Sequence, residues 1–362
     1  MSTVSTQSTV STESSSQGIP LSVLDRALTR RGAADDVILR EVVDRAVRLE
    51  ALGFRGVWVA EHHAVPGIAG SSPALLASAV AGATSRIRVG TGGIMVPAHP
   101  PFVIAEAVST LEALHPSRVD VGLGASTGFT SAVRWSLRQD DDAASHFEAD
   151  VEELTDVLSG RGAVTLRPLP AAPTPLYLLT GGGRLPFAAR AGLGAVLGGP
   201  SVDPGAAGGV AGDEESDARG PESHPGATAY RSAFVPSSWF SAPRLIVSAS
   251  VAVAPTEEAA RRLALPEAWA MALSRSTGSF DSLLPAEDLD VAALSSQQAR
   301  RVEQALASTV HGTPEQVAAR LQRIVRYTGA DELLVTGDVS DRAGGELSDR
   351  LLGQMVIRRG DV

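Results

Sequence analysis

The stretch IRVGTGGIMVPAHPPFVIAEAVSTLEALHPSRVDVGLG, residues 87–124, decides the fold because it predicts two strands joined by a helix. Its two ends, IRVGTGG (87–93) and VDVGLG (119–124), are short apolar runs that contain glycine. Between them, residues 102–114 repeat apolar side chains at helical spacing. Because the two runs show no polar alternation, they are typical of strands buried on both faces of a parallel sheet.

The same alternation of strand and helix continues on both sides of this unit. The predicted strands cover residues 21–24, 56–60, 87–93, 119–124, 175–181, 194–199, 244–254 and 331–337. The predicted helices cover residues 35–52, 73–85, 102–114, 146–159, 185–191, 256–271 and 314–328. Eight strands, most of them followed by a helix, predict an α/β fold of the TIM (β/α)8 barrel type with insertions. A doubly wound sheet is the alternative, but it does not usually need eight repeats.

The barrel is expected to occupy residues 19–362 as a single domain. The first 18 residues, rich in Ser and Thr, lack the features of a secretory or organellar leader and are interpreted as a disordered tail. An insertion at about 200–227 is rich in Gly, Pro and acidic residues, which favours either a disordered segment or an active-site lid. A second insertion, at about 274–308, contains a helical pattern near residues 297–307.

The composition excludes several classes of function. The 362 residues include no cysteine, so disulfides, thiol nucleophiles and thiolate metal sites are excluded, and a reducing cytoplasm is expected. All 31 basic residues are arginine, so there is no lysine for a Schiff base or a phosphate-binding P-loop. A net charge of −10 argues against nucleic acid as a partner, and the apolar runs are too short to span a membrane.

Glu61, His62 and His63 directly follow the second predicted strand, where barrels carry their functional loops. A histidine that titrates near neutrality suits proton transfer, and Glu61 is expected to orient it or to bind a polar ring edge. Structural hydrogen bonding remains an alternative for each histidine. Adjacent residues of an extended chain point to opposite sides and no HExxH helix follows, so we expect no metal site.

Two glycine-rich loops also follow strands. Thr91, Gly92 and Gly93 leave a backbone with little side chain, which permits close approach by a flat ring system or simply forms a tight barrel turn. Gly181, Gly182 and Gly183 precede Arg184 at a helix start, an arrangement that can hold a phosphate or form a flexible loop.

Asp25 and His99 lie at the ends of the first and third predicted strands and are further candidates for the site. Arg118 and Asp120 come before the carboxyl end of their strand. They are therefore interpreted as strand-start and barrel-layer residues.

Three stretches together resemble the bacterial luciferase-like flavin monooxygenases. They are WVAEHH (58–63), residues 85–124 and HGTPEQVAARLQRIVRYTGADELLVTG (311–337). The resemblance is strong over residues 19–124 and at the C-terminal unit, and loose over 140–310. It is strongest to two-component actinobacterial members, some of which tailor polyketides.

The resemblance implies a flavin-dependent monooxygenase of the cytoplasm. Reduced FMN, supplied by a separate flavin reductase, would react with O2 to give a C4a-peroxyflavin that oxygenates a small organic substrate, such as a polyketide. His62 matches the family's catalytic histidine, with Glu61 nearby, and Gly92–Gly93 matches its non-proline cis peptide. Asp25 and Thr91 are then expected beside the cofactor, and His63 and His99 beside the substrate or behind the catalytic residues. A homodimer is a further family expectation.

One departure concerns the cofactor phosphate. The family carries an arginine after the fourth strand, whereas GLGASTG (122–128) places Ala125 and Ser126 there. Our hypothesis is that Arg184, with Gly181 to Gly183, replaces this arginine. This departure keeps open the alternative of a noncatalytic or weakly flavin-binding protein. Because related barrels use the deazaflavin F420, an F420-dependent oxidoreductase is a further alternative.

Overall fold

A computed structural model of the chain describes residues 18–205 and 223–358. Within these ranges, eight parallel strands close into a barrel in the order β1-β2-β3-β4-β5-β6-β7-β9, with β9 pairing back to β1. The strands are β1 (Leu21–Asp25), β2 (Gly56–Val59), β3 (Arg88–Met95), β4 (Val119–Gly124), β5 (Leu176–Thr180), β6 (Gly194–Leu197), β7 (Leu245–Val253) and β9 (Glu332–Thr336). The predicted TIM barrel is confirmed.

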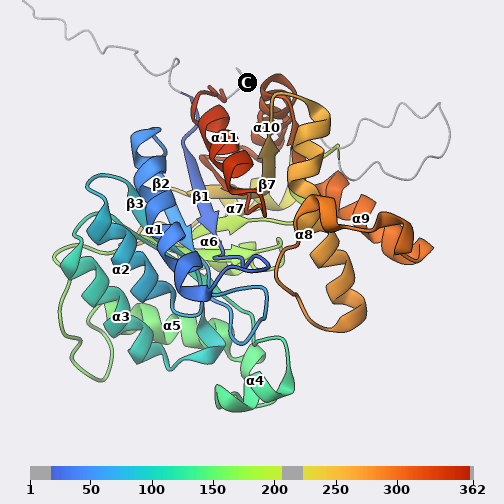
Figure 1. Ribbon diagram of the computed structural model, residues 1–362. Helices are drawn as coiled ribbons and strands as arrows, with labels where there is room; N and C mark the ends of the chain where they lie inside the picture. Colours follow the sequence, from blue (N-terminus) through green and yellow to red (C-terminus); the bar gives the residue numbers. More distant parts are fainter. Residues whose placement is uncertain (1–17, 206–222, 359–362) are drawn as a thin grey trace, which may run out of the picture.

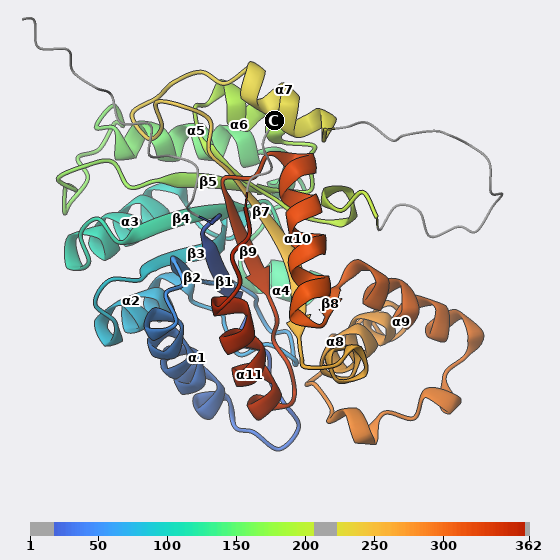
Figure 2. The same cartoon turned by 90° about the horizontal axis from the view of Figure 1, so that it is seen from above.

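Most of the helices cover the outside of the barrel (Figures 1 and 2). They are α1 (Asp35–Ala51), α2 (Pro73–Ala83), α3 (Pro101–Leu114), α4 (Ser131–Ser136), α5 (Phe147–Leu158), α6 (Leu185–Arg190), α7 (Pro225–Ser232), α8 (Glu257–Thr277), α9 (Ser296–Ser308), α10 (Pro314–Thr328) and α11 (Arg342–Gly353). Helices α8 and α9 pack on each other at one side of the barrel, and α4 lies beyond the carboxyl ends of the strands (Figures 1 and 2).

Along each strand, successive side chains alternate between facing the outer helices and facing the barrel interior, as the pleat of a strand requires. The large interior side chains come from five different strands: Trp58, Tyr177, Val196, Ile246 and Leu334. The Trp58 ring needs the space left by Gly90, where a Cβ atom would lie 2.4 Å from Trp58 Cδ2. The glycine of β3 is therefore a packing requirement of the barrel core.

The amino-terminal end of the barrel is closed by ion pairs. Asp120 pairs with Arg88 at 2.6 Å, and the buried Glu332 pairs with Arg55 and Arg244 at 2.8 Å each. The interpretation of Asp120 as a barrel-layer residue is confirmed, which leaves the opposite end of the barrel for a functional site.

Four elements escaped prediction: the short helices α4 and α7, the strand β8 and the helix α11. The strand β8 (Val310–Gly312) pairs with the last part of β7, but three residues are too few to show a period. Helix α11 contains Gly344 and Gly345, which weaken the helical signal. Helix α8 continues past Met271, where it was predicted to end, and reaches Thr277.

The two predicted insertions are described only in part. Residues 206–222 of the insertion at about 200–227 and residues 1–17 of the N-terminal segment lie outside the described residues. The helix predicted near 297–307 is α9. Within the described ranges, no helix combines the length and the apolar character that a membrane crossing needs.

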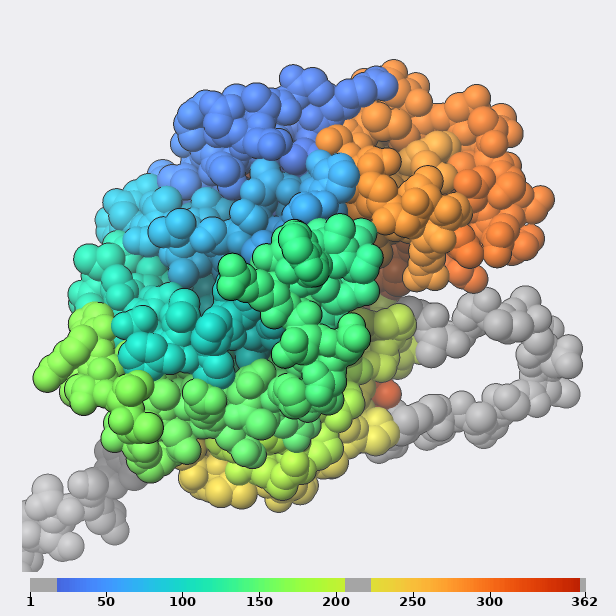
Figure 3. Space-filling model, turned by 90° about the horizontal axis from the view of Figure 1, so that it is seen from below, coloured from blue at the N-terminus to red at the C-terminus, as the bar shows by residue number. Residues whose placement is uncertain are grey.

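The carboxyl ends of the eight barrel strands form one opening, which we call the mouth. Figure 3 views this face: the segment around α4 (green) lies across it beside the α8–α9 region (orange), and the surface dips between them. The loops after β2, β3, β4 and β5 all reach this face, so the predicted site residues are brought to one end of the molecule.

Candidate active site

Glu61 holds two histidines at the mouth. Its Oε1 atom lies 2.6 Å from His63 Nε2 and 2.6 Å from His99 Nε2, and its Oε2 accepts the backbone N–H of Met95 at 2.7 Å. We call Glu61, His63 and His99 the Glu61 cluster. Burial alone would raise the pKa of Glu61, but the donors from His99, Met95 and His63 outweigh it, so the net pKa lies below the ordinary value.

The Glu61 cluster brings together ligand-type atoms within 4.8 Å of one another. Ligands that share a tetrahedral metal at about 2.0–2.1 Å lie about 3.3 Å apart, whereas both N···O distances here are 2.6 Å. The shorter spacing fits charge-assisted hydrogen bonds to a carboxylate. The cluster is therefore a hydrogen-bonded network. Of the histidines after β2, Glu61 orients His63 and not His62. Its expected alternative role, binding a polar ring edge, stays a prediction.

His62 is half-buried and is not among the hydrogen-bond partners of Glu61. Its Nδ1 atom is buried and has no hydrogen-bond partner within the part of the chain that the structure describes. Burial first, and then the positive charge of Arg26, lower the pKa of His62 to about 4. The imidazole is therefore neutral at physiological pH and can accept a proton.

Phe129, from the loop after β4, lies over His62. The two rings are nearly parallel, at 18°, with centroids 6.2 Å apart, and the phenyl side chain is 65% exposed. Sequence reasoning missed Phe129 because it lies 67 positions from His62, and its only signal was an aromatic residue in a loop after a barrel strand.

Gly92 and Gly93 follow the middle of β3 and are joined by a cis peptide bond, which confirms the expectation from the resemblance. A Cβ atom on Gly93 would lie 2.8 Å from the carbonyl oxygen of Gly122, so β3 and β4 approach too closely for any side chain. The hydroxyl of Thr91, a residue expected beside the cofactor, exchanges hydrogen bonds with the backbone of Gly122, so it ties the two strands together.

The loop after β5 carries the predicted phosphate residues. The Oγ1 atom of Thr180 accepts the backbone N–H groups of Gly182 at 3.0 Å and Arg184 at 3.2 Å, so these two are not free for a ligand. The N–H of Gly183 has no partner among the described residues. Thr180, which the sequence analysis did not select, keeps its own hydroxyl hydrogen for donation.

Arg184 begins α6 and stacks on a neighbouring ring. Its guanidinium carbon lies 5.0 Å from the centroid of Phe147, at the start of α5. Across residues 18–205 and 223–358, no carboxylate forms an ion pair with it. Ala125 is half-buried against the main core and Ser126 is exposed, so neither offers a cation in place of the family's arginine.

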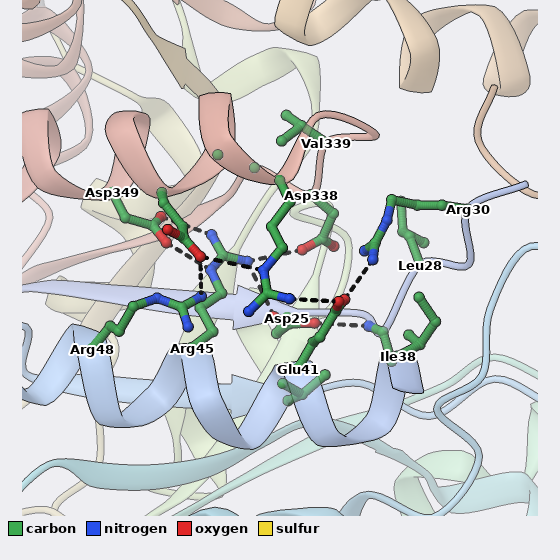
Figure 4. A pocket seen from close by; sticks show the side chains of 16 residues that line it. Asp25, Leu28, Arg30, Ile38, Glu41, Arg45, Arg48, Asp338, Val339 and Asp349 are labelled. Carbon is green, nitrogen blue, oxygen red and sulfur yellow. Dashed lines mark hydrogen bonds and ion pairs between the residues drawn. The ribbon is translucent and has the colours of Figure 1, made fainter. Parts of the chain in front are cut away.

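Asp25 lies outside this group, which corrects its predicted placement. Its carboxylate accepts the N–H of Ala27 at 2.9 Å and pairs with Arg45 of α1 at 3.1 Å. Figure 4 shows Arg45 between α1 and α11, where it also reaches Asp338 and Asp349. Because Asp25 shares a strand face with Val23, it points toward the helices, and burial raises its pKa to about 6.

The next residue, Arg26, points into the mouth instead. It pairs with Glu267 of α8 at 2.6 Å and with Asp338 at 3.3 Å. The strand alternation that turns Asp25 outward thus places Arg26 inward.

The chain matches known proteins over most of its length. Residues 20–332 match the family model for the luciferase-like monooxygenases. A luciferase-like monooxygenase of Escherichia coli (strain K12) is 31% identical over 329 residues, which are 89% of this chain and 92% of that protein.

Solved structures share the fold. The crystal structure of apo-MsnO8 aligns with a TM-score of 0.75 and 27% identity over 93% of this chain and 98% of that one. The FMN complex of the oxygenating constituent of 3,6-diketocamphane monooxygenase, from the CAM plasmid of Pseudomonas putida, aligns with a TM-score of 0.67 over 94% of this chain and 98% of that one. At 14% identity, this second likeness shows the fold alone.

Proposed function

Because this chain belongs to the luciferase-like monooxygenase family, we propose that it is a flavin-dependent monooxygenase that uses reduced FMN and O2 to oxygenate a small organic substrate. The bound flavin would supply the electrons and the place where oxygen is activated, and the protein would bind, orient and shield it. The observation that carries the proposal is His62, whose neutral ring presents an unpartnered buried nitrogen beside the mouth.

The end of β5 and the loop after it fit a flavin phosphate ester in several respects. Gly181 and Gly183 have open space where a Cβ atom would lie, so a ligand can approach their backbone. Thr180 and Gly183 retain hydrogen-bond donors, and Arg184 has a cation without a carboxylate partner among the described residues. We therefore assign phosphate binding to this loop and ring binding to the Gly92–Gly93 backbone.

His62 would accept or return a proton at Nδ1, because burial keeps the ring neutral and leaves that atom without a partner. An unpartnered buried nitrogen costs about 1–3 kcal/mol, and a donor on the bound ligand would remove this cost. The Glu61 cluster would hold the loops after β2 and β3 at a fixed spacing around it.

The testing experiment is an anaerobic titration of the purified protein with photoreduced FMN, followed by mixing with O2 while absorbance and oxygen uptake are recorded. We expect saturable binding and oxygen uptake, with His62→Ala retaining flavin binding but changing the reaction with O2. Absence of binding at a large excess of reduced FMN would contradict the proposal. Binding of F420 in its place would support the F420-dependent alternative.

Two partners belong to the same proposal. A separate flavin reductase would supply reduced FMN, since the proposal assigns no reduction step to this chain. A second copy of the chain would cover the apolar residues exposed on α2 and α3, among them Leu75 and Leu114, which are 74% and 63% exposed.

A further inference from the structure

A cavity of about 340 Å³ opens in the mouth on the side of β6, β7, β9 and β1. The residues assigned to the flavin lie within β3 and on the loops after β2 and β5, around the other half of the barrel. None of them lines this cavity. The proposed cofactor site therefore does not account for it.

The cavity has the size and walls of a small-molecule site. Ligand pockets usually measure about 300–1,000 Å³ and are mostly apolar with a few polar groups. Here the apolar wall comes from Leu24, Val202, Val310 and Ile324. A molecule of about ten to fifteen non-hydrogen atoms matches a cavity at the lower end of that range.

Hydroxyl groups form the polar part of the wall. Ser250 and Thr336 lie 3.0 Å apart and hydrogen-bond to each other. Ser248, two residues earlier on β7, also lines the cavity, and its hydroxyl has no partner among residues 18–205 and 223–358. Ser248 is thus the hydroxyl that can donate to, or accept from, a ligand without losing an existing bond.

The charged residues at the cavity are already compensated. Arg26 is paired with Glu267 at 2.6 Å and with Asp338 at 3.3 Å. Asp203 is paired with Arg320 at 2.6 Å and accepts the N–H of Gly205 at 2.9 Å. An ionic ligand would find no unpaired opposite charge in the cavity wall, so no ion pair would offset the free energy lost when the ligand leaves water.

We propose that this cavity is the substrate compartment and that it takes a small, neutral organic molecule whose carbonyl or hydroxyl oxygen hydrogen-bonds to Ser248. The inference rests on the proposed function, which it deepens by naming the substrate class. Arg26 lines the cavity and is also close enough to His62 to act on it electrostatically, so the compartment adjoins the proposed proton-transfer residue.

The test uses three bicyclic probes of similar shape: tetralin, 1-tetralone and tetralin-1-carboxylate. Their binding is measured by calorimetry and ligand-observed NMR for the wild type, Ser248→Ala, Ser248→Leu and the exposed control Ser85→Ala. We expect 1-tetralone to bind most tightly in the wild type. Ser248→Ala should weaken the ketone about two- to tenfold, with little effect on tetralin, because one neutral hydrogen bond is lost.

Ser248→Leu should weaken both neutral probes, since its larger side chain fills part of the cavity, and Ser85→Ala should change nothing. Tightest binding of the carboxylate, or ketone binding unchanged in Ser248→Leu, would overturn the inference. So would failure of all three probes in a protein that binds reduced FMN. Ketone binding without any flavin binding would support the compartment and contradict the proposed function, so the two failures are distinguishable.

Discussion

Glu61 and His99 are 38 positions apart in the chain, yet the Oε1 atom of Glu61 lies 2.6 Å from the Nε2 atom of His99. The contact joins the loop after β2 to the loop after β3. His63, from the same loop as Glu61, hydrogen-bonds to the same oxygen atom. A single buried carboxylate thus fixes the spacing of two mouth loops. His62, which lies between Glu61 and His63 in the sequence, takes no part in this network.

Glu61→Gln should destabilise the protein by about 1–3 kcal/mol. The carboxylate accepts three N–H groups, and a Gln amide would direct its own N–H₂ at one of these donors. Urea denaturation at pH 7 measures the effect. Glu106→Gln, an exposed change on α3, is the matched control, and a Glu61→Gln variant as stable as this control would show that the cluster contributes nothing to stability.

His62 should remain neutral down to about pH 5. Burial, followed by the charge of Arg26, lowers its pKa to about 4, against about 6.5 in an unfolded chain. Imidazole NMR of a ¹⁵N-labelled sample, assigned with His62→Gln, measures the titration directly. A His62 midpoint near 6.5 would contradict the burial argument.

The same shift predicts a pH dependence of stability. The folded state prefers neutral His62, so its contribution is fully present above pH 6.5 and is lost as the pH falls toward 4. Between pH 7 and pH 5 the wild type should lose about 1–2 kcal/mol more than His62→Gln. Asp25, with its pKa raised to about 6, acts in the opposite direction, and because it is present in both proteins its effect cancels in the difference.

Arg184→Ala should weaken FMN binding about ten- to a hundredfold and leave riboflavin binding nearly unchanged. The reason is that only FMN carries the phosphate that the guanidinium would hold, and such a charge-assisted contact contributes about 1.5–3 kcal/mol. Anaerobic titration with both reduced flavins measures the ratio. Arg190→Ala, at the other end of α6, is the control. Equal losses for FMN and riboflavin would indicate that Arg184 acts through packing on Phe147 instead.

Gly93→Ala should destabilise the barrel by about 1–3 kcal/mol, because the added carbon would lie 2.8 Å from the Gly122 carbonyl oxygen and force β3 from β4. Gly82→Ala is the matched control: nothing lies within 4 Å of its Cβ position on α2. That exposed helical change should stabilise by about 0.5–1 kcal/mol. Chemical denaturation of both variants separates the steric effect at Gly93 from the general effect of replacing glycine by alanine. A Gly93→Ala variant as stable as the wild type would contradict the close approach of the strands.

Leu75→Glu should convert the proposed homodimer into a monomer, since a charge would enter an apolar interface on α2. Light scattering after size exclusion measures the mass. Val235→Glu, which changes an exposed residue away from α2 and α3, should leave the mass unchanged. A wild-type protein that is monomeric at micromolar concentration would contradict the proposed homodimer.

The helical and strand periods of the sequence predicted the barrel, because the positions of apolar residues in the eight strands and their helices reflect which side chains are buried. They also placed Glu61, His62, His63, His99 and the Gly92–Gly93 pair at strand ends, and therefore at the mouth. The short strand β8 and the glycine-containing helix α11 were missed because each carries too weak a period.

Only the tertiary structure decided which of these side chains meet. Nothing in the sequence told which face of β1 points inward, so Asp25 was assigned to the mouth where Arg26 lies. The pairing of Glu61 with His99, the use of Thr180 by two backbone N–H groups and the cavity beside Ser248 depend on loops from separate βα units. Periodicity encodes the burial of each residue, whereas hydrogen bonds between loops depend on distances that are fixed only when the barrel closes.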